Sequence, residues 1–541
     1  MKTANIQRLI GALLLTGIMF TGCSKDNTLD EIVSSSQQEQ EQESDPLIEV
    51  LKSIDGVRNV ELKKSQQGTD SIYYFSFRQL INHENPDEGT FDQQVAISFK
   101  GFDKNVVLYT HGYAMSSDVD AFPYASLCIQ LDANQVNVEH RYFGNSLPEP
   151  SDKMSFTYLN ADQQAQDLHA IVQALKSSVF KSGKWASTGV SKDGITSALY
   201  AYYSDQYGWN DIDVFVPFCA PFITGSVHNG QFTCMNPSTG AYLEQVCGSG
   251  YPAGSVEAIA YQRLHDIPQY LCTNQKVRDE VNKWIAGMLA SDYRKILEQY
   301  NRKSPMSTGD LEKDATAFSW HIYYDFLFQK FSYVQFRLWA PLVPDPAEAL
   351  TSDEAMNRLC TFITLSGTEL NDSLRVLAAK NQLTRSAATD AYDKYWTFIN
   401  NLRSDNSAPY DVQAFKELGY TDYAYSTVDG NFLTKEQAFN VNEQFSLQKK
   451  FEGLYPQDEG RLMRSFRQWV ATETTQNVIF VYAYNDPWTG ARPDDAVVSQ
   501  NPKTEMFIDP IATHNDYFLE SSLYTNETKT GIINALNKFL K

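Results

Sequence analysis

The chain has 541 residues, of which 42% are hydrophobic and 13% aromatic, and this composition excludes a chain that is disordered throughout. Its 66 acidic and 45 basic residues give a formal charge of −21, which argues against a nucleic-acid partner because phosphates require a basic face. The length predicts roughly two to four domains.

The N-terminus predicts export and lipid attachment. A basic start leads into the apolar run Leu9–Phe20, which is too short for a comfortable membrane span, and Thr21-Gly22-Cys23 follows. A cysteine after two small residues is typical of a bacterial lipoprotein processing site, so we expect a signal peptide over 1–22 and lipidation of Cys23. A plain secretory signal or an uncleaved anchor are the alternatives.

Residues 23–46 are rich in Ser, Gln, Glu and Asp and cannot form a core, so they predict a disordered tether. A tethered body would stand off a membrane that it contacts through its lipid alone. We therefore expect an exported lipoprotein of the outer membrane, the cell surface or the periplasm.

The first large segment, 47–225, predicts a parallel sheet flanked by helices. Apolar or alternating runs mark strands, and apolar side chains at helical spacing mark helices. From Val106 onward the order is strand, strand, helix, strand, helix, strand, which favours a parallel α/β arrangement. The strands are expected at Asp70–Arg78, Gln94–Lys100, Val106–Thr110, the run ending at Glu139, Lys184–Thr188 and Asp213–Phe218, and the helices at Asp162–Ser177 and Gly194–Tyr203.

The segment 226–470 predicts a large, mainly helical insertion, since no β pattern returns before Asn477. Its helices are expected at Ala258–Tyr300, Leu311–Leu338 and Ser386–Leu402. The segment 471–541 then completes the sheet domain with strands at 477–482 and Thr504–Ile508 and a helix at Thr530–Leu540.

Six cysteines follow Cys23, and export permits disulfides among them. Cys234 and Cys247 are close enough in sequence for a local bridge, whereas Cys128 and Cys219 lie in apolar contexts that suit small buried side chains. No Cys-x-x-Cys or His-x-x-x-His spacing occurs, so neither a metal nor a cofactor is predicted.

Ser191 is the candidate nucleophile. It lies in Gly189-Val190-Ser191-Lys192-Asp193, where a predicted strand turns into a predicted helix. This is the context of the Gly-x-Ser-x-Gly turn of the α/β-hydrolase fold, in which the N–H after the serine helps to stabilise an oxyanion. Asp193 replaces the last glycine, and it either faces outward or alters the site. The alternative for Ser191 is an ordinary turn residue without a catalytic role.

Two later residues complete a candidate triad in the chain order Ser, acid, His. Asp486 ends the predicted strand at 477–482, and His514 lies in the loop after the last strand. The alternatives are a turn-forming aspartate before proline and an exposed loop histidine. His111 is a rival base, but its chain order is wrong.

A second oxyanion donor is expected after an early strand. The loop Thr110-His111-Gly112-Tyr113 follows the run Val106–Tyr109, so the N–H of Tyr113 is the candidate beside that of Lys192. A simple strand-ending glycine turn is the alternative.

Five blocks of the sequence occur in a characteristic order: Asn82–Pro86 with Gly89–Phe91, Leu108–Tyr113, Glu139–Ser146, Lys184–Gly194 and Asp486–Trp488. In these blocks the sequence resembles the secreted prolyl tripeptidyl-aminopeptidases, serine exopeptidases of the α/β-hydrolase fold. The lysine after the nucleophile is distinctive of this family, whereas the related lysosomal Pro-X carboxypeptidases and dipeptidyl-peptidases tend to have tyrosine.

The resemblance implies a triad of Ser191, Asp486 and His514 and a helical cap over the site, but Asp193 departs from the family's Ser-Lys-Gly-Gly pattern. An aminopeptidase binds a protonated N-terminus, for which Glu139 is a candidate, and a structural ion pair with Arg141 or another neighbour is the alternative.

Two aromatic features are further candidates for substrate contacts. Trp488 follows the candidate acid, and the aromatic stretch Trp320–Trp339 is a candidate proline pocket, with a core helix as the alternative.

The expected function is therefore a serine exopeptidase that releases short N-terminal peptides through an acyl-enzyme, with a preference for proline. An esterase or lipase with the same triad is one alternative. The other is a weakly active or inactive surface lipoprotein that binds peptides, for which Asp193 is the main support.

Overall fold

The computed structural model describes residues 45–64, 71–150, 154–223, 225–228, 231–235, 242–244, 407–419, 451, 453–484, 486–512, 514, 519 and 524–541. The predicted signal peptide, Cys23, nearly all of the tether, the three helices expected in the insertion and the aromatic stretch Trp320–Trp339 lie outside these ranges.

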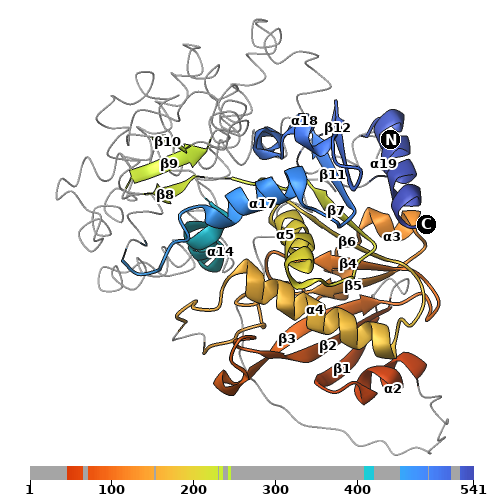
Figure 1. Cartoon of the computed structure of the whole chain (residues 1–541). Coiled ribbons are helices and arrows are strands. Elements are labelled where there is room, and N and C mark those ends of the chain that lie inside the picture. Colours follow the sequence, from red (N-terminus) through yellow and green to blue (C-terminus); the bar gives the residue numbers. More distant parts are fainter. Residues whose placement is uncertain are drawn as a thin grey trace, which may run out of the picture.

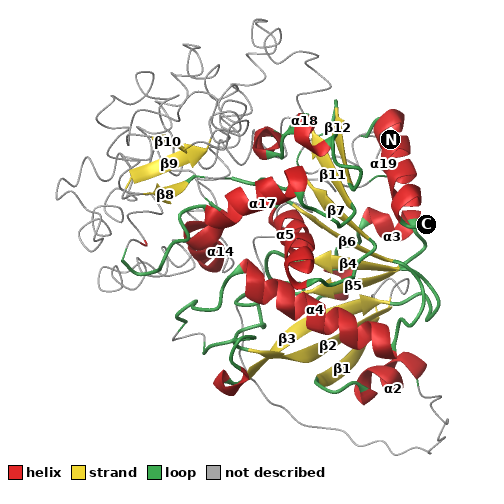
Figure 2. Ribbon diagram, in the orientation of Figure 1, coloured by secondary structure: helices red, strands yellow, loops and turns green. Residues whose placement is uncertain are grey.

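A nine-stranded sheet forms the centre of the molecule (Figures 1 and 2). Its order is β1-β2-β3-β5-β4-β6-β7-β11-β12. The first three neighbouring pairs, β1-β2, β2-β3 and β3-β5, are antiparallel, and the remaining pairs are parallel. This confirms the predicted α/β-hydrolase sheet. The strands are β1 (Val57–Lys64), β2 (Ser71–Leu80), β3 (Thr90–Ser98), β4 (Val106–Thr110), β5 (Asn134–Val138), β6 (Trp185–Val190), β7 (Val214–Phe218), β11 (Val478–Ala483) and β12 (Thr504–Asp509).

Helices cover both faces of the sheet (Figure 1). Along β4, Val106 and Leu108 join the core under α2, α4, α5 and α17, whereas Val107 and Tyr109 join the core under α3 and α19. Side chains that alternate between two apolar layers explain why this strand is a continuous apolar run. The helices are α2 (Pro46–Ser53), α3 (Ser126–Gln130), α4 (Ala161–Ser178), α5 (Lys192–Tyr207), α14 (Ser407–Gln413) with a π-helical turn at Ala414–Leu418, α17 (Arg461–Thr472), α18 (Asp495–Val498) and α19 (Asn526–Phe539).

Two features depart from the expected organisation. A small antiparallel sheet of β8 (Ser226–His228), β9 (Gln231–Met235) and β10 (Tyr242–Glu244) stands where no strand was predicted. Strands this short show no readable alternation. In addition, α17 runs across position 470, the predicted end of the insertion, and packs on α5, where Trp469 Nε1 donates to Asp205 at 2.8 Å.

Cys128 and Cys219 are both buried, as their apolar contexts predicted. The side chains of Cys234 and Cys247 lie outside the described residues, so the local bridge between them stays a prediction.

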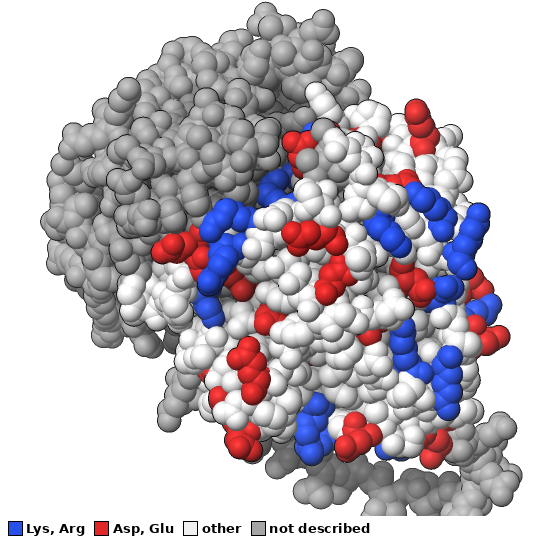
Figure 3. Space-filling view, in the orientation of Figure 1, with Lys and Arg blue, Asp and Glu red and all other residues white. Residues whose placement is uncertain are grey.

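The surface of the described body carries both signs of charge. Lys and Arg are interspersed with Asp and Glu over the face in Figure 3, with no extended basic patch. Within the described ranges, no helix combines the length and apolarity that a membrane span requires.

Candidate active site

Ser191 occupies a sharp turn between β6 and α5. Its φ of 57° and ψ of −122° are unusual for a residue with a side chain, and such strain concentrates at functional sites. The Ser191 N–H donates to Phe218 O at 2.9 Å, which ties the turn to the neighbouring strand. A Cβ on Gly194 would lie 2.8 Å from the same oxygen, so only glycine permits this approach. The strand–turn–helix context predicted for Ser191 is therefore present.

Asp486 and His514 lie side by side. His514 Nδ1 is 2.8 Å from Asp486 Oδ2, and both side chains are buried. The other carboxylate oxygen of Asp486 accepts the N–H of Trp488 at 2.9 Å, which fixes the orientation of the acid.

Both residues lie at the same edge of the sheet as Ser191. Val190 pairs with Phe218 and Phe218 pairs with Val481, so the parallel strands β6, β7 and β11 end in line. Asp486 follows β11 and His514 follows β12, the next strand. The carboxyl ends of parallel strands are where α/β proteins form their sites.

His111 has a different environment. It is buried, its Nε2 has no hydrogen-bond partner among the described residues, and its ring lies 4.9 Å from that of Tyr109. Burial lowers the pKa of His111 to about 4. A catalytic histidine base needs a carboxylate partner, and Asp486 is such a partner for His514.

The two predicted oxyanion donors are close to each other. Gly112 lies against the start of α5, where an added Cβ would be 2.7 Å from Lys192 Cγ and 2.8 Å from the Lys192 carbonyl carbon. The N–H groups of Lys192 and Tyr113 donate to no other described residue. The glycine thus brings the loop that carries Tyr113 against the nucleophile turn.

The side chain of Lys192 is buried against this loop. Its Nζ donates to the carbonyl of Gly112 and lies 5.3 Å and 4.9 Å from the ring centroids of Tyr113 and Phe143. Burial lowers the pKa of Lys192 to about 7, although the negative charges of Asp193 and Glu417 oppose this shift.

Asp193 faces inward. Its Oδ1 accepts the Gly112 N–H at 2.6 Å and its Oδ2 accepts the Tyr109 hydroxyl at 3.0 Å. Although the residue keeps some exposed surface, its carboxylate is enclosed, and burial raises its pKa to about 6. Of the two alternatives for Asp193, the structure therefore excludes the outward-facing one.

Glu139 is fully engaged with the protein. It accepts the N–H groups of Met115 at 2.8 Å and Asn145 at 3.0 Å and the hydroxyl of Ser146 at 2.7 Å. Burial raises its pKa and these hydrogen bonds oppose the rise. Glu139 thus holds two loops together through hydrogen bonds from neutral groups.

The ion pair that the sequence suggested between Glu139 and Arg141 does not form. Arg141 instead binds both carboxylate oxygens of Asp167, each at 2.7 Å, and all of these groups are buried.

The side chain of Trp488 packs against Ile223 and Ala491 beside the candidate acid.

Residues 407–419 contribute groups that the sequence analysis missed. The ring of Tyr410 is 5.9 Å from that of Tyr113, and Asp411 lies close enough to help raise the pKa of Tyr113, after burial and the charges of Tyr410 and Asp193. Lys416 anchors the segment by donating to the carbonyls of residues 156, 157 and 159. A seven-residue helix that passes into a π-helical turn has no clear apolar period, so no sequence signal marked it.

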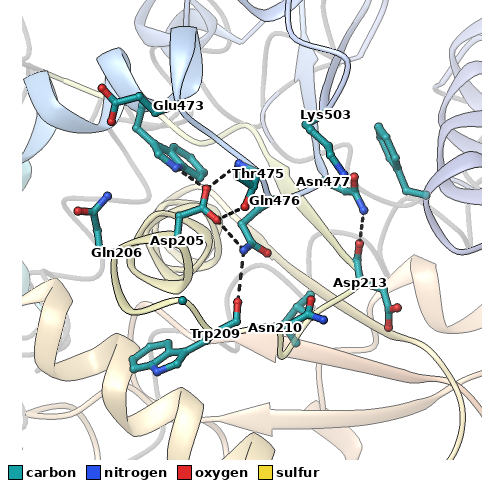
Figure 4. Close-up of a pocket in the computed structure, with 14 residues that line it drawn as sticks. Asp205, Gln206, Trp209, Asn210, Asp213, Glu473, Thr475, Gln476, Asn477 and Lys503 are labelled. Atoms are coloured by element: carbon teal, nitrogen blue, oxygen red, sulfur yellow. Dashed lines mark hydrogen bonds between the residues drawn. The ribbon is translucent and has the colours of Figure 1, made fainter.

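A cavity of about 590 Å³ lies at the opposite edge of the sheet (Figure 4). Asp213, Asn477 and Lys503, which line it, directly precede β7, β11 and β12. Asp205, also in its wall, accepts hydrogen bonds from the neighbouring residues Trp469, Thr475 and Gln476 and so closes a structural network. This cavity is remote from the turn of Ser191.

Among the described residues, Cys219, Asp486 and His514 form a group whose potential ligand atoms lie within 4.8 Å of one another. The 2.8 Å separation of Asp486 and His514 is that of a hydrogen bond. The absence of a metal stays a prediction.

Two sequence comparisons find proteins similar to part of this chain. Residues 41–233 match the family model described as PS-10 peptidase S37. The chain is also 34% identical over 168 residues to the prolyl tri/tetrapeptidyl aminopeptidase of Streptomyces mobaraensis, a match that covers 31% of this chain and 32% of that protein.

Similar solved structures include a bromoperoxidase from Bacillus anthracis, with a TM-score of 0.30 and 12% identity over 86% of this chain and 99% of that chain. A homoserine O-acetyltransferase from Staphylococcus aureus has a TM-score of 0.35 and 11% identity over 88% of this chain and 96% of that chain. The match of residues 41–233 to the PS-10 peptidase S37 family and the match to the Streptomyces mobaraensis aminopeptidase confirm the family resemblance predicted from the sequence.

Proposed function

We propose that this protein is a serine exopeptidase in which Ser191 attacks the scissile carbonyl. The observation that carries the proposal is the Asp486–His514 pair at the sheet edge where the strained Ser191 lies. His514 takes the proton of the serine hydroxyl and passes it to the leaving amine, while Asp486 holds the imidazole tautomer and stabilises the imidazolium.

The tetrahedral intermediate is stabilised by the N–H groups of Lys192 and Tyr113. Both are backbone donors without another described acceptor, and preorganised donors of this kind supply much of the rate enhancement in acyl transfer. Loss of the amine leaves an acyl-enzyme on Ser191, and water, activated by His514, releases the N-terminal fragment.

The substrate is a peptide with a free N-terminus and proline at the cleavage position. The name of the Streptomyces mobaraensis relative supports this choice. Asp411 is the candidate for the protonated N-terminus, because it lies close enough to Tyr113, beside the proposed oxyanion donor, for its charge to help raise the pKa of that tyrosine.

We also propose that the chain acts outside the cytoplasm as a lipoprotein. The basic and apolar N-terminus with Cys23 supports export and lipidation, and the polar segment 23–46 supports a tethered catalytic body.

The proposal is tested with two synthetic peptides that differ only at the N-terminus. The purified enzyme is incubated with a peptide that has a free N-terminus and proline at position 3, and with its N-acetylated form, and the products are identified by mass spectrometry. We expect a single N-terminal tripeptide from the free peptide and little cleavage of the acetylated one. Internal cleavage of both peptides, or hydrolysis of simple esters without any peptide cleavage, would contradict it.

A further inference from the structure

We propose that Asp193 is a positioning residue that, together with the side chain of Lys192, clamps Gly112 and aims the Tyr113 N–H at the oxyanion. The inference rests on the proposed function, because it concerns the oxyanion donors of that reaction. It reverses the expectation that an aspartate in place of the motif glycine weakens the site.

The clamp fixes both peptide groups that flank Gly112. The N–H of Gly112 belongs to the peptide group that follows His111, and Asp193 Oδ1 accepts it at 2.6 Å. The carbonyl of Gly112 belongs to the peptide group that carries the Tyr113 N–H, and Lys192 Nζ donates to it.

The geometry of the second peptide group links this clamp to catalysis. The described chain has no cis peptide bonds, and in a planar trans peptide the C=O and N–H point in opposite directions. A carbonyl held toward the Lys192 amine therefore directs the Tyr113 N–H away from it. A hydrogen bond from the Lys192 amine also polarises the peptide group and strengthens its N–H as a donor.

Asp193 is itself held in place. Its Oδ2 accepts the Tyr109 hydroxyl at 3.0 Å, and its backbone carbonyl accepts the Thr110 hydroxyl at 3.0 Å. One residue of the nucleophile turn thus contacts three positions at the end of β4. A glycine at position 193, as in the Gly-x-Ser-x-Gly pattern, would leave the Gly112 N–H without this acceptor.

The test compares Asp193→Gly and Asp193→Asn with a matched carboxylate on the same helix. Asp205 of α5 also accepts several hydrogen bonds, but at the edge of the sheet opposite Ser191, in the wall of the cavity shown in Figure 4. Each full-length variant is assayed with a tripeptide 4-nitroanilide, its active sites are titrated with a fluorophosphonate, and its affinity for the matching peptide aldehyde is measured.

We expect Asp193→Gly to lower kcat per titrated site by about 10- to 100-fold with little change in KM, less than the ~10²–10³-fold lost when a donor itself is removed. Aldehyde affinity falls by the same factor, because the aldehyde adduct carries the oxyanion. Asp193→Asn keeps one carbonyl acceptor, so its kcat per site and aldehyde affinity should lie between those of the wild type and Asp193→Gly. Asp205→Asn should keep the wild-type kcat per site but lower the thermal stability.

Unchanged kcat and aldehyde affinity in Asp193→Gly would overturn the clamp while leaving the proposed function intact. If instead the wild type neither hydrolyses peptides nor reacts with the fluorophosphonate, the proposed function fails, and amide hydrogen exchange tests the clamp alone. Faster exchange at Gly112 in Asp193→Gly but not in Asp205→Asn supports the clamp, and equal exchange in all three proteins refutes it.

Discussion

His514 Nδ1 lies 2.8 Å from Asp486 Oδ2, although the two residues are 28 positions apart in the chain. Adjacent parallel strands, β11 and β12, bring them together because each residue follows the carboxyl end of its strand. The proposed reaction requires this pair, since the imidazole must present one defined nitrogen to Ser191.

Substitution of Asp486 by Asn keeps the size of the side chain but removes the charge that orients the imidazole. We expect kcat to fall by on the order of 10⁴-fold, as measured with a peptide 4-nitroanilide. The matched control is His169 of α4, which makes a similar, partly buried pair with Asp211 at 2.6 Å, and His169→Ala should keep kcat unchanged. Equal losses in both variants would point to a general effect on folding.

The closeness of Gly112 to α5 predicts a selective effect of adding one methyl group. In Gly112→Ala the new Cβ would meet Lys192 at 2.7 Å and 2.8 Å, partly against backbone, so the loop with Tyr113 must shift and kcat should fall at least tenfold. Gly101→Ala is the control, because its Cβ would meet only side-chain atoms at 3.2 Å and 3.4 Å. Wild-type kcat in Gly112→Ala would show that the loop position is not critical.

Peptides with a free or an acetylated N-terminus test whether Asp411 or Glu139 binds the N-terminus of the substrate. Asp411→Asn should raise KM for peptides with a free N-terminus about tenfold, the equivalent of ~1.4 kcal/mol of lost charge-assisted binding, and leave KM for the slowly cleaved acetylated peptides unchanged. Glu139→Gln should lower the thermal midpoint without changing the ratio of the two KM values, since Glu139 binds loops. The opposite pattern would restore Glu139 as the substrate ligand.

The raised pKa of Asp193 makes stability depend on pH. Burial raises that pKa from 3.8 to about 6, so the folded protein binds this proton more tightly than the unfolded chain. The contribution of Asp193 to the free energy of unfolding should therefore decrease as pH rises from about 4 to about 6 and then level off. Urea unfolding of the wild type and Asp193→Asn across this range measures the difference, and a difference independent of pH would contradict the assignment.

The Arg141–Asp167 pair should be essential for stability. Both side chains are fully buried, so Asp167→Ala leaves an uncompensated guanidinium and should lower the free energy of unfolding by about 3–5 kcal/mol. Lys104→Ala, which breaks the exposed pair with Asp132, should leave the urea midpoint unchanged. Similar midpoints for the two variants would argue against a special role for the buried pair.

The sheet core was predictable because its strands are buried on both faces. The strand expected at Val106–Thr110 matches β4, and the helix expected at Asp162–Ser177 differs from α4 by one residue at each end. The pairing of Asp486 with His514 was also predictable, since chain order and strand ends suffice to place the two residues.

Other features depend on contacts between distant residues. Whether Asp193 faces solvent or Gly112 depends on how closely β4 approaches α5, which no local pattern encodes. From the sequence, Glu139 was a plausible ligand for the substrate's N-terminus. Its three hydrogen-bond donors lie in two loops that meet it only in the folded protein, so the sequence did not reveal that its carboxylate is occupied. The position of α14 near Tyr113 likewise follows from tertiary packing.

Covalent labelling tests the central claim most directly. The full-length protein is treated with a fluorophosphonate, and the adduct is located by peptide mass spectrometry in the wild type, Ser191→Ala and His514→Ala. We predict one adduct on Ser191 in the wild type, none in Ser191→Ala and strongly slowed labelling in His514→Ala. An unlabelled wild type, or an adduct that persists in Ser191→Ala, would contradict the assignment of Ser191 as the nucleophile.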